Sequence, residues 1–296
     1  MASHPKWHLT QNLLILLPYT AALVAFSTLT LPLLASSQTI DFKRTCVGLD
    51  NLLQLCVGAK PPRGNSVSLV AIAGATNARA FIHNSEDISG PLPTDFGFSK
   101  LSYLALANNK LTGPIPTSVG HLHDTLLEIV LLNNQLSGCL PRELGMLNKA
   151  AVIDAGKNQL TGPIPSSFSC LSRVEQLNLA GNRLYGRVPD TLCRLAGQAG
   201  RLGNLTLRGN YFTSVGPACT ALIKDRVLDV NNNCIPGFAN QRRPAECVAF
   251  QSQPKKCPEV STQVSCPAAA STNAAAPVER KARDYYSFLT YASLHE

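Results

Sequence analysis

Residues Leu101–Pro116 read LSYLALANNKLTGPIP, and three later stretches repeat this pattern in register. They are LLEIVLLNNQLSGCLP (126–141), AAVIDAGKNQLTGPIP (150–165) and VEQLNLAGNRLYGRVP (174–189). Two looser copies follow at 202–215 and 227–236. One asparagine marks each copy, and successive marks are 25, 24, 24, 28 and 23 residues apart; they are Asn109, Asn134, Asn158, Asn182, Asn210 and Asn233. Four close copies in one register indicate a chain built from one repeated structural unit.

The spacing and the consensus Leu-x-x-Leu-x-Leu-x-x-Asn-x-Leu are those of a leucine-rich repeat, whose period is roughly 20–29 residues. The Leu-x-Leu part alternates apolar and polar residues, which predicts a short strand with one buried face. One repeat cannot bury that face alone, so neighbouring repeats must stack. We therefore predict an α/β solenoid, a right-handed curved array with a parallel concave β-sheet and disulfide-stapled caps. The Leu-x-Gly-x-Ile-Pro segment that ends each copy, as in 111–116, resembles the plant-specific leucine-rich repeat. The marked asparagines should form a ladder, bonding backbone groups at each bend.

Composition changes along the chain predict five parts. Residues 1–37 resemble a signal peptide, since an apolar run over 13–34 precedes the small residues 35–37, and cleavage is expected before Gln38. The length of that run leaves an uncleaved membrane anchor as the alternative. An N-terminal cap should follow at 38–65, repeats at 66–236 (one degraded plus six), and a Cys-containing C-terminal cap at 237–257. Residues 258–296 are small and polar, which predicts a flexible tail. After signal cleavage we expect no stable membrane span.

Ten cysteines fit an exported chain, because disulfides persist in oxidising compartments. We expect pairs in the N-terminal cap (Cys46, Cys56), between successive repeats (Cys193, Cys219) and in the C-terminal cap (Cys234, Cys247, Cys257). The cap stretch 45–58 is interpreted as a short apolar helix. No cysteine stacks on Cys139 from a neighbouring repeat, and Cys170 is its nearest candidate partner. Connectivity cannot be deduced from sequence, and the rival zinc site is disfavoured because the chain has no Cys-x-x-Cys pair.

Side chains between the buried leucines should line the concave sheet and form a ligand-binding face. The candidates are Tyr103, Glu128, Val130, Asp154, Gln176, Asn178, Thr206, Arg208, Asp229 and Asn231. A rigid, curved surface of mixed polarity suits a peptide or protein ligand. Asn204-Leu205-Thr206 is an N-glycosylation sequon on the same face. A glycan there would block part of the surface; alternatively, fast strand folding leaves the site bare.

The sequence contains no constellation typical of catalysis. Nucleophile-elbow, P-loop and zinc-protease motifs are absent, and His121-x-His123 has no third metal ligand at useful spacing. We therefore expect neither enzymatic activity nor a metal or other cofactor.

The formal charge of +8 is concentrated late in the array, where 183–256 contains eleven basic and four acidic residues. Such an excess favours an anionic partner such as pectin or an acidic protein surface, unless it serves solubility alone. Nucleic acid is not expected, because the predicted signal peptide indicates export.

Four stretches are more specific than the general repeat: TLLEIVLLNNQLSGCLPRELGML (125–147), VEQLNLAGNRLYGRVPDTLCRL (174–195), GNYFTSVGPAC (209–219) and NCIPGFANQRRPAECVAF (233–250). Together they resemble the repeat domain of plant leucine-rich repeat extensins, without that family's Ser-Pro-rich tail. The resemblance implies a secreted protein of the plant cell wall or apoplast, related to wall-growth signalling, whose relatives bind secreted cysteine-containing growth-regulating peptides. Two alternatives remain: an inhibitor of wall-degrading polygalacturonase, and a structural wall protein held by pectin.

Overall fold

The computed structural model describes residues 79–85, 87–196, 200–254, 256–257 and 266 in full, and the backbone of 46–49 and 52–56. All of these belong to one compact unit, 39–296. The predicted signal peptide 1–37, and the predicted tail 258–296 apart from Cys266, lie outside the described residues. Among the helices that are described, none is long and apolar enough to cross a membrane.

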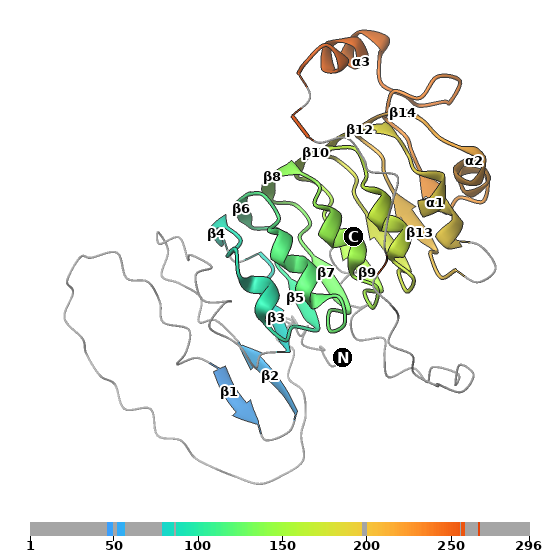
Figure 1. Ribbon diagram of the computed structural model, residues 1–296. Helices are drawn as coiled ribbons and strands as arrows, with labels where there is room; N and C mark the ends of the chain where they lie inside the picture. The colour runs from blue at the N-terminus through green and yellow to red at the C-terminus, as the bar shows by residue number, and fades with distance from the viewer. Residues whose placement is uncertain are drawn as a thin grey trace, which may run out of the picture. The chain divides into compact units, whose positions relative to one another are not determined.

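Successive repeats place their Leu-x-Leu segments side by side as the strands of one sheet. Within the described residues this sheet has nine strands in the order β1-β2-β3-β5-β7-β9-β11-β13-β15. From β3 onward the strands are parallel and in register, so that Leu104, Ile129 and Ile153 are direct partners (Figure 1). The bounds are β3 (Ala80–Ile82), β5 (Tyr103–Ala105), β7 (Glu128–Val130), β9 (Val152–Asp154), β11 (Gln176–Asn178), β13 (Asn204–Thr206) and β15 (Leu228–Asp229).

A second parallel sheet, which the sequence analysis did not predict, is formed by the Leu-x-Gly-x-Ile-Pro segments. Its described strands follow the order β14-β12-β10-β8-β6-β4. They are β4 (Ser89–Pro91), β6 (Lys110–Gly113), β8 (Gln135–Cys139), β10 (Gln159–Gly162), β12 (Arg183–Arg187) and β14 (Tyr211–Ser214). The glycine of each Leu-x-Gly step adopts a positive φ, for example +75° at Gly113 and +99° at Gly162. Such an angle suits glycine and bends the strand without breaking the pairing.

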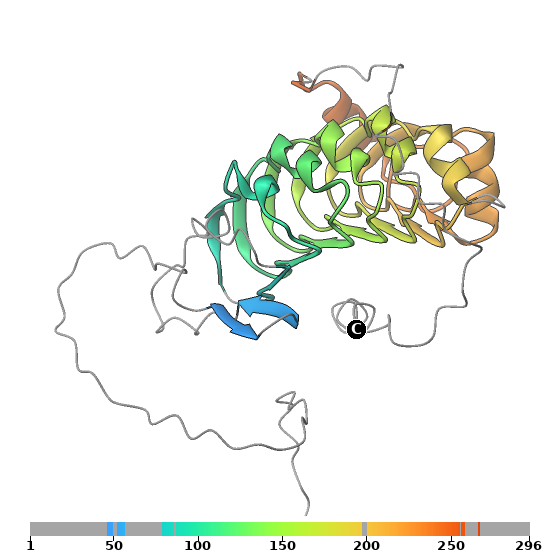
Figure 2. The same cartoon turned by 60° about the horizontal axis from the view of Figure 1, so that its bottom comes forward.

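Short helical turns close each repeat on the side opposite the first sheet (Figure 2). Most are 3₁₀ turns: η2 (Phe96–Phe98), η3 (Thr117–Leu122), η4 (Arg142–Met146), η5 (Ser166–Cys170) and η6 (Arg194–Ala196). Of these, η3, η4 and η5 begin directly after the repeat's proline. The α-helices are α1 (Asp190–Cys193), α2 (Pro217–Lys224) and α3 (Pro244–Gln251). The two sheets and these turns enclose one continuous core.

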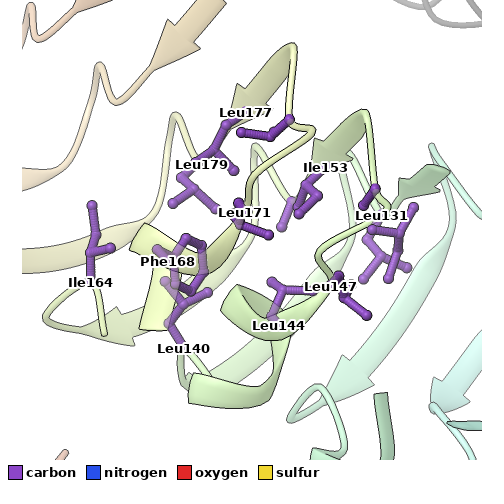
Figure 3. Close-up of a cluster of buried hydrophobic side chains, with 14 of the residues drawn as sticks. Leu131, Leu140, Leu144, Leu147, Ile153, Ile164, Phe168, Leu171, Leu177 and Leu179 are labelled. Atoms are coloured by element: carbon purple, nitrogen blue, oxygen red, sulfur yellow. The ribbon is translucent and has the colours of Figure 1, made fainter. Parts of the chain in front are cut away.

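The core is a stack of apolar layers, each shared by neighbouring repeats. Figure 3 shows Leu144 and Leu147 of one helical turn beside Phe168 and Leu171 of the next, with Ile153 from the strand side. Phe168 and Leu144 are completely buried. Burying such a side chain stabilises by roughly 1.5–3 kcal/mol, and each layer needs its neighbour to do so. The solenoid fold predicted from the repeat period is therefore the observed one.

The six marked asparagines are buried and connect each repeat to the one before it. Asn158 is representative: its Nδ2 donates to the Leu131 carbonyl of the preceding repeat at 3.0 Å, and to Ala155 and Gly156 within its own turn. Its Oδ1 accepts a hydrogen bond from the backbone nitrogen of Leu136 at 3.0 Å. The same pattern recurs at the other five positions, Asn109, Asn134, Asn182, Asn210 and Asn233. Each amide thus satisfies backbone groups that the bend leaves without partners.

The N-terminal cap differs from the expected helix. Residues Cys46–Leu49 (β1) and Leu52–Cys56 (β2) pair as antiparallel strands, and Leu55 of β2 pairs with Ala80 of β3. Apolar runs this short do not distinguish helix from strand by periodicity, and the open edge of β3 offers backbone partners that favour a strand. Cys46 and Cys56 are opposite each other in the strand register. Their side chains, and hence the predicted pairing, lie outside the described residues.

Two of the disulfides join segments that are distant in sequence. The other two join neighbouring segments. Cys193–Cys219 links α1 to α2, as suggested for successive repeats, and Cys234–Cys247 fixes α3, as suggested for the C-terminal cap. The suggested pairing of Cys139 with Cys170 is wrong: Cys139 pairs with Cys257, and Cys170 pairs with Cys266, a cysteine that the sequence analysis assigned to no pair. Cys257 therefore does not belong to the cap pairing. After α3 the chain instead meets the second sheet at Cys257, a contact that repeat spacing cannot reveal.

Aromatic contacts hold α3 to the end of the second sheet. The rings of Tyr211 and Phe250 are stacked, with centroids 3.6 Å apart and planes inclined by 7°. The Arg242 guanidinium lies 4.2 Å from the centre of the Tyr211 ring. The ring centroids of Tyr185 and Phe250 are 6.1 Å apart. Stacking and cation–π contacts of this kind contribute roughly 0.5–1.5 kcal/mol each beyond burial. They place the C-terminal cap where the returning segment begins.

Candidate functional site

The solvent side of the nine-stranded sheet, here called the sheet face, consists of the residues that alternate with the core leucines. Its described members divide into three groups by exposure. Buried members of the predicted set are Glu128, Val130, Asp154 and Asn178; partly buried ones are Tyr103, Gln176, Thr206 and Asp229; exposed ones are Arg208 and Asn231. The expectation that the whole set lines an open surface is therefore wrong for the four buried residues.

The buried part of the sheet face has an apolar cluster of its own. It contains Ala107, Val130 and Leu132, which are 0%, 3% and 3% exposed, with Ala105 packed against it. These residues alternate with Leu106, Ile129 and Leu131 of the main core, so they stand on the opposite side of the strands. Ala107 and Leu132 were missed from the sequence. Continuing the two-residue alternation beyond the strand ends would have found them.

Glu128 stands at the edge of this cluster and is only 7% exposed. Its register partners on the sheet are Tyr103 and Val152. Burial raises the pKa of Glu128 from 4.5 to about 7. Among the residues that the structure describes, no group donates a hydrogen bond to its Oε1. A buried carboxylate oxygen without a donor costs about 1–3 kcal/mol.

Asp154 and Asn178 are buried because they bond to each other and to the backbone. Asp154 Oδ1 accepts a hydrogen bond from the Gly156 nitrogen at 2.8 Å, and its Oδ2 accepts one from Asn178 Nδ2 at 3.1 Å. Asn178 Oδ1 accepts one from the Ala180 nitrogen at 3.0 Å. Asp154 is the register partner of Val130, so this pair adds a second acidic side chain beside the apolar cluster.

The C-terminal end of the sheet face is polar and exposed. The Arg208 guanidinium lies 3.9 Å from the Asp229 carboxylate, with 62% and 33% of these side chains exposed. Asn204 is exposed, and its Oδ1 accepts a hydrogen bond from Thr206 Oγ1 at 3.0 Å. An exposed ion pair of this length contributes at most about 1 kcal/mol. The sheet face therefore changes from apolar and acidic at β5–β9 to polar and neutral at β13–β15.

The two histidines considered as metal ligands contact backbone carbonyls of their own helical turn. Nδ1 of His121 lies 3.0 Å from the Ser118 carbonyl, and Nδ1 of His123 lies 3.1 Å from the Gly120 carbonyl. The ring of His121 also contacts Phe98 at 4.3 Å. No group of three or more metal-binding side chains occurs in the described part of the chain. Both histidines therefore have local structural partners.

Comparison with known proteins agrees with this architecture. The sequence matches the Leucine Rich Repeat family over residues 100–122 and 173–195. No curated protein matches the chain.

Several solved plant structures have a similar fold. The plant peptide hormone receptor RGFR1 in complex with RGF2 is 28% identical, with a TM-score of 0.52, covering 58% of this chain and 27% of the receptor. The Arabidopsis receptor kinase HAESA, in complex with the peptide hormone IDA and the co-receptor SERK1, is 28% identical, with a TM-score of 0.53 and coverages of 59% and 29%. The LRR ectodomain of GASSHO1/SCHENGEN3 from Arabidopsis thaliana, bound to CASPARIAN STRIP INTEGRITY FACTOR 2, is 28% identical, with a TM-score of 0.52 and coverages of 59% and 21%. The chain thus spans less than a third of these receptors.

Proposed function

We propose that the chain is a secreted plant protein of the cell wall or apoplast that binds a peptide or protein segment on strands β5–β11 of the sheet face. Two observations support an extracellular ligand-binding role. Four disulfides lie within the described residues, and disulfides are typical of oxidising compartments. The similar solved structures include plant receptors in complex with peptide hormones. The resemblance to extensin repeat domains supports the wall or apoplast as the location.

The observation that carries the proposal is the carboxylate of Glu128. One of its oxygens is buried without a donor from the described residues. An ammonium, guanidinium or amide N–H group of a ligand would supply that donor, and a charge-assisted bond in a site of low dielectric is strong. The raised pKa of Glu128 shows how poorly the charge is solvated without such a group.

The surroundings of Glu128 define the chemistry of the ligand. The buried cluster of Ala107, Val130 and Leu132 lies next to it, and the buried carboxylate of Asp154 is one strand away, so the surroundings of Glu128 are apolar and acidic. A peptide segment with a basic side chain beside an apolar one matches both features. The parallel sheet holds these groups on a rigid frame, so little conformational entropy is lost on binding. Rigid presentation of a few convergent polar groups within an apolar surface is typical of ligand sites.

Retention of secreted peptides tests this function. The mature chain (38–296) would be immobilised and exposed to an extracellular peptide fraction from plant tissue, and retained peptides identified by mass spectrometry. We expect peptides with adjacent basic and apolar residues to be retained, and Glu128→Gln to reduce their retention about tenfold. Glu143→Gln, in η4 on the helical side, is the matched control and should retain them fully. Equal retention by all three proteins, or no retained peptide, would overturn the proposal.

A polyanion such as pectin is a second candidate partner. Arg183 and Arg187 on β12, Lys224 at the end of α2 and Arg226 just after it are exposed. Within the described residues no ion pair involves these four side chains. Attraction between such charges and a polyanion weakens as salt is added. Elution of the protein from a pectin column by moderate salt, with no effect of Glu128→Gln, would support this role. Passage through the column at low salt would exclude it.

A further inference from the structure

We infer that Asn204 carries an N-linked glycan that covers the C-terminal end of the sheet face, so that ligands are confined to strands β5–β9. The modification itself is independent of the proposed function. The restriction on ligands rests on the proposed function. Asn204-Leu205-Thr206 is the only Asn-x-Ser/Thr sequon in the 296-residue sequence. The chain therefore offers one position for this modification.

The structure places the acceptor side chain on the accessible side of the strand. Leu205 is completely buried in the core, so Asn204 and Thr206 project from the opposite side of β13. Asn204 is exposed. The bond from Thr206 Oγ1 uses Asn204 Oδ1, and within the described residues no hydrogen bond is made by Nδ2, the atom that a glycan would occupy. A sugar on Nδ2 therefore displaces no packed group.

The transfer uses a co-reactant that the secretory pathway supplies, an oligosaccharide linked to a lipid diphosphate. Asn204 Nδ2 forms a bond to the anomeric carbon of the first sugar, and the bond between that carbon and the diphosphate oxygen breaks. The lipid diphosphate leaves with the electron pair, and one amide proton is lost to base. No oxidation or reduction occurs.

The strand pairing dictates when this transfer takes place. In the folded chain the Asn204 nitrogen donates to the Glu175 carbonyl, and the Leu205 nitrogen donates to the Val227 carbonyl of the next repeat. The sequon is thus held between two neighbours and cannot extend into an enzyme cleft. Transfer must precede the pairing of β13 with β15, which becomes possible only after residues 227–229 have entered the same compartment.

A glycan at this position would cover particular neighbours. Gln176 of β11 is the register partner of Asn204, and Asp229 of β15 is that of Thr206. Strands in a sheet lie about 4.8 Å apart, so the first sugars stand above Gln176 on one side and the Arg208–Asp229 pair on the other. Glu128, two strands before β11, stays free of them. The glycan would thus separate the polar end of the face from the apolar, acidic part.

Intact-mass measurement of the chain secreted from plant cells tests the modification. We expect the wild-type chain and Thr206→Ser to carry one glycan that a peptide N-glycosidase removes, and Thr206→Ala to have its unmodified mass. Thr206→Ala keeps Asn204 and the strand pairing, so it also serves as the bare reference. A wild-type chain secreted at its unmodified mass would overturn the inference.

Chemical labelling of arginines with a phenylglyoxal reagent tests the coverage without any ligand. Arg208 should react several-fold more slowly in the glycosylated chain than in Thr206→Ala. Arg183, exposed on the second sheet, is the internal control and should react equally in both. Equal reactivity of Arg208 would contradict coverage of this end of the face. If peptides identified by retention bind Thr206→Ala but not the glycosylated chain, then the confinement of ligands to β5–β9 is wrong. Failure to retain any peptide disproves only the proposed function.

Discussion

Gly162 of β10 is in direct contact with Cys257, the residue that brings the returning C-terminal segment onto the second sheet. A Cβ added at Gly162 would lie 3.0 Å from Sγ and 3.1 Å from Cβ of Cys257, closer than packed atoms normally approach. The disulfide from Cys257 to Cys139 closes a loop of 118 residues. The glycine that bends each repeat therefore has a second role here, because it leaves room for this disulfide.

Replacing Gly162 by alanine tests this role, and Gly90 provides a matched control. Both glycines have a similar positive φ, +99° and +94°, but a Cβ at Gly90 would meet nothing within 4 Å. Gly90→Ala should lower the free energy of unfolding by about 1 kcal/mol through backbone strain alone. Gly162→Ala should lower the free energy of unfolding by at least about 1 kcal/mol more than Gly90→Ala does. Mass spectrometry after alkylation should also find free thiols at Cys139 and Cys257. An equal loss of unfolding free energy in both variants, with the Cys139–Cys257 disulfide intact, would refute the steric conflict between a side chain at 162 and Cys257.

The asparagine ladder makes a prediction about stability. Asn158→Ala removes an amide that connects the Leu131 carbonyl of one repeat with the backbone of the next. Several buried backbone groups then lack partners, and the free energy of unfolding should fall by about 3 kcal/mol in urea denaturation. Gln159→Ala, at the exposed neighbouring position, should change it by less than about 0.5 kcal/mol. A small effect of Asn158→Ala would show that the ladder does not hold the repeats together.

The burial of Glu128 predicts a pH dependence of stability. Its folded-state pKa of about 7 lies above the ordinary value of 4.5, so the folded chain binds the proton more tightly than the unfolded chain. This contribution is fully present below about pH 4.5 and is lost as the pH rises through 7, amounting to roughly 3 kcal/mol. Glu128→Gln should remove that part of the pH dependence and raise the unfolding midpoint at pH 8. Asp124→Asn, an exposed acid, should leave the profile unchanged. If the unfolding free energy of the wild type and of Glu128→Gln depended on pH in the same way between pH 4.5 and 8, the raised pKa of Glu128 would be disproved.

The contact between Phe250 and Tyr211 predicts how α3 is held. Phe250→Ala removes the stacked ring and should lower the free energy of unfolding by about 2 kcal/mol. Backbone hydrogen exchange should become faster only in residues 244–251. The Cys234–Cys247 disulfide keeps the helix attached, so the repeats should stay protected. Val248, 65% exposed on the same helix, is the control, and Val248→Ala should change neither quantity. Unchanged exchange in Phe250→Ala would mean that the disulfide alone positions α3.

The sequence predicted those features that each repeat encodes locally. Asn158 and Leu131 could be assigned because spacing and alternation are properties of one repeat. The second sheet was not predicted, because a three- to five-residue segment with glycine and proline looks like a turn until its neighbours pair with it. The Cys139–Cys257 bond joins positions 118 residues apart, and no periodic signal connects them.

The candidate site was predicted in position but not in character. Alternation placed Glu128 and Val130 on the solvent side of the sheet, and they do stand opposite the leucine core. Their burial depends on neighbours from adjacent repeats, such as Ala107 and Leu132, and on bonds such as that between Asp154 and Asn178. These are properties of the stacked array, so a single repeat does not reveal them.

Site-specific photo-crosslinking measures most directly whether the sheet face binds ligands. A photoreactive residue would replace either Tyr103, the register partner of Glu128 on the sheet face, or Gln159, on the second sheet. Each protein would then be irradiated with the peptides retained by the immobilised chain. We expect covalent peptide adducts from position 103, no such adducts when the chain also carries Glu128→Gln, and none from position 159. Adducts from position 159 alone, or in equal amounts from both positions, would contradict binding on the sheet face.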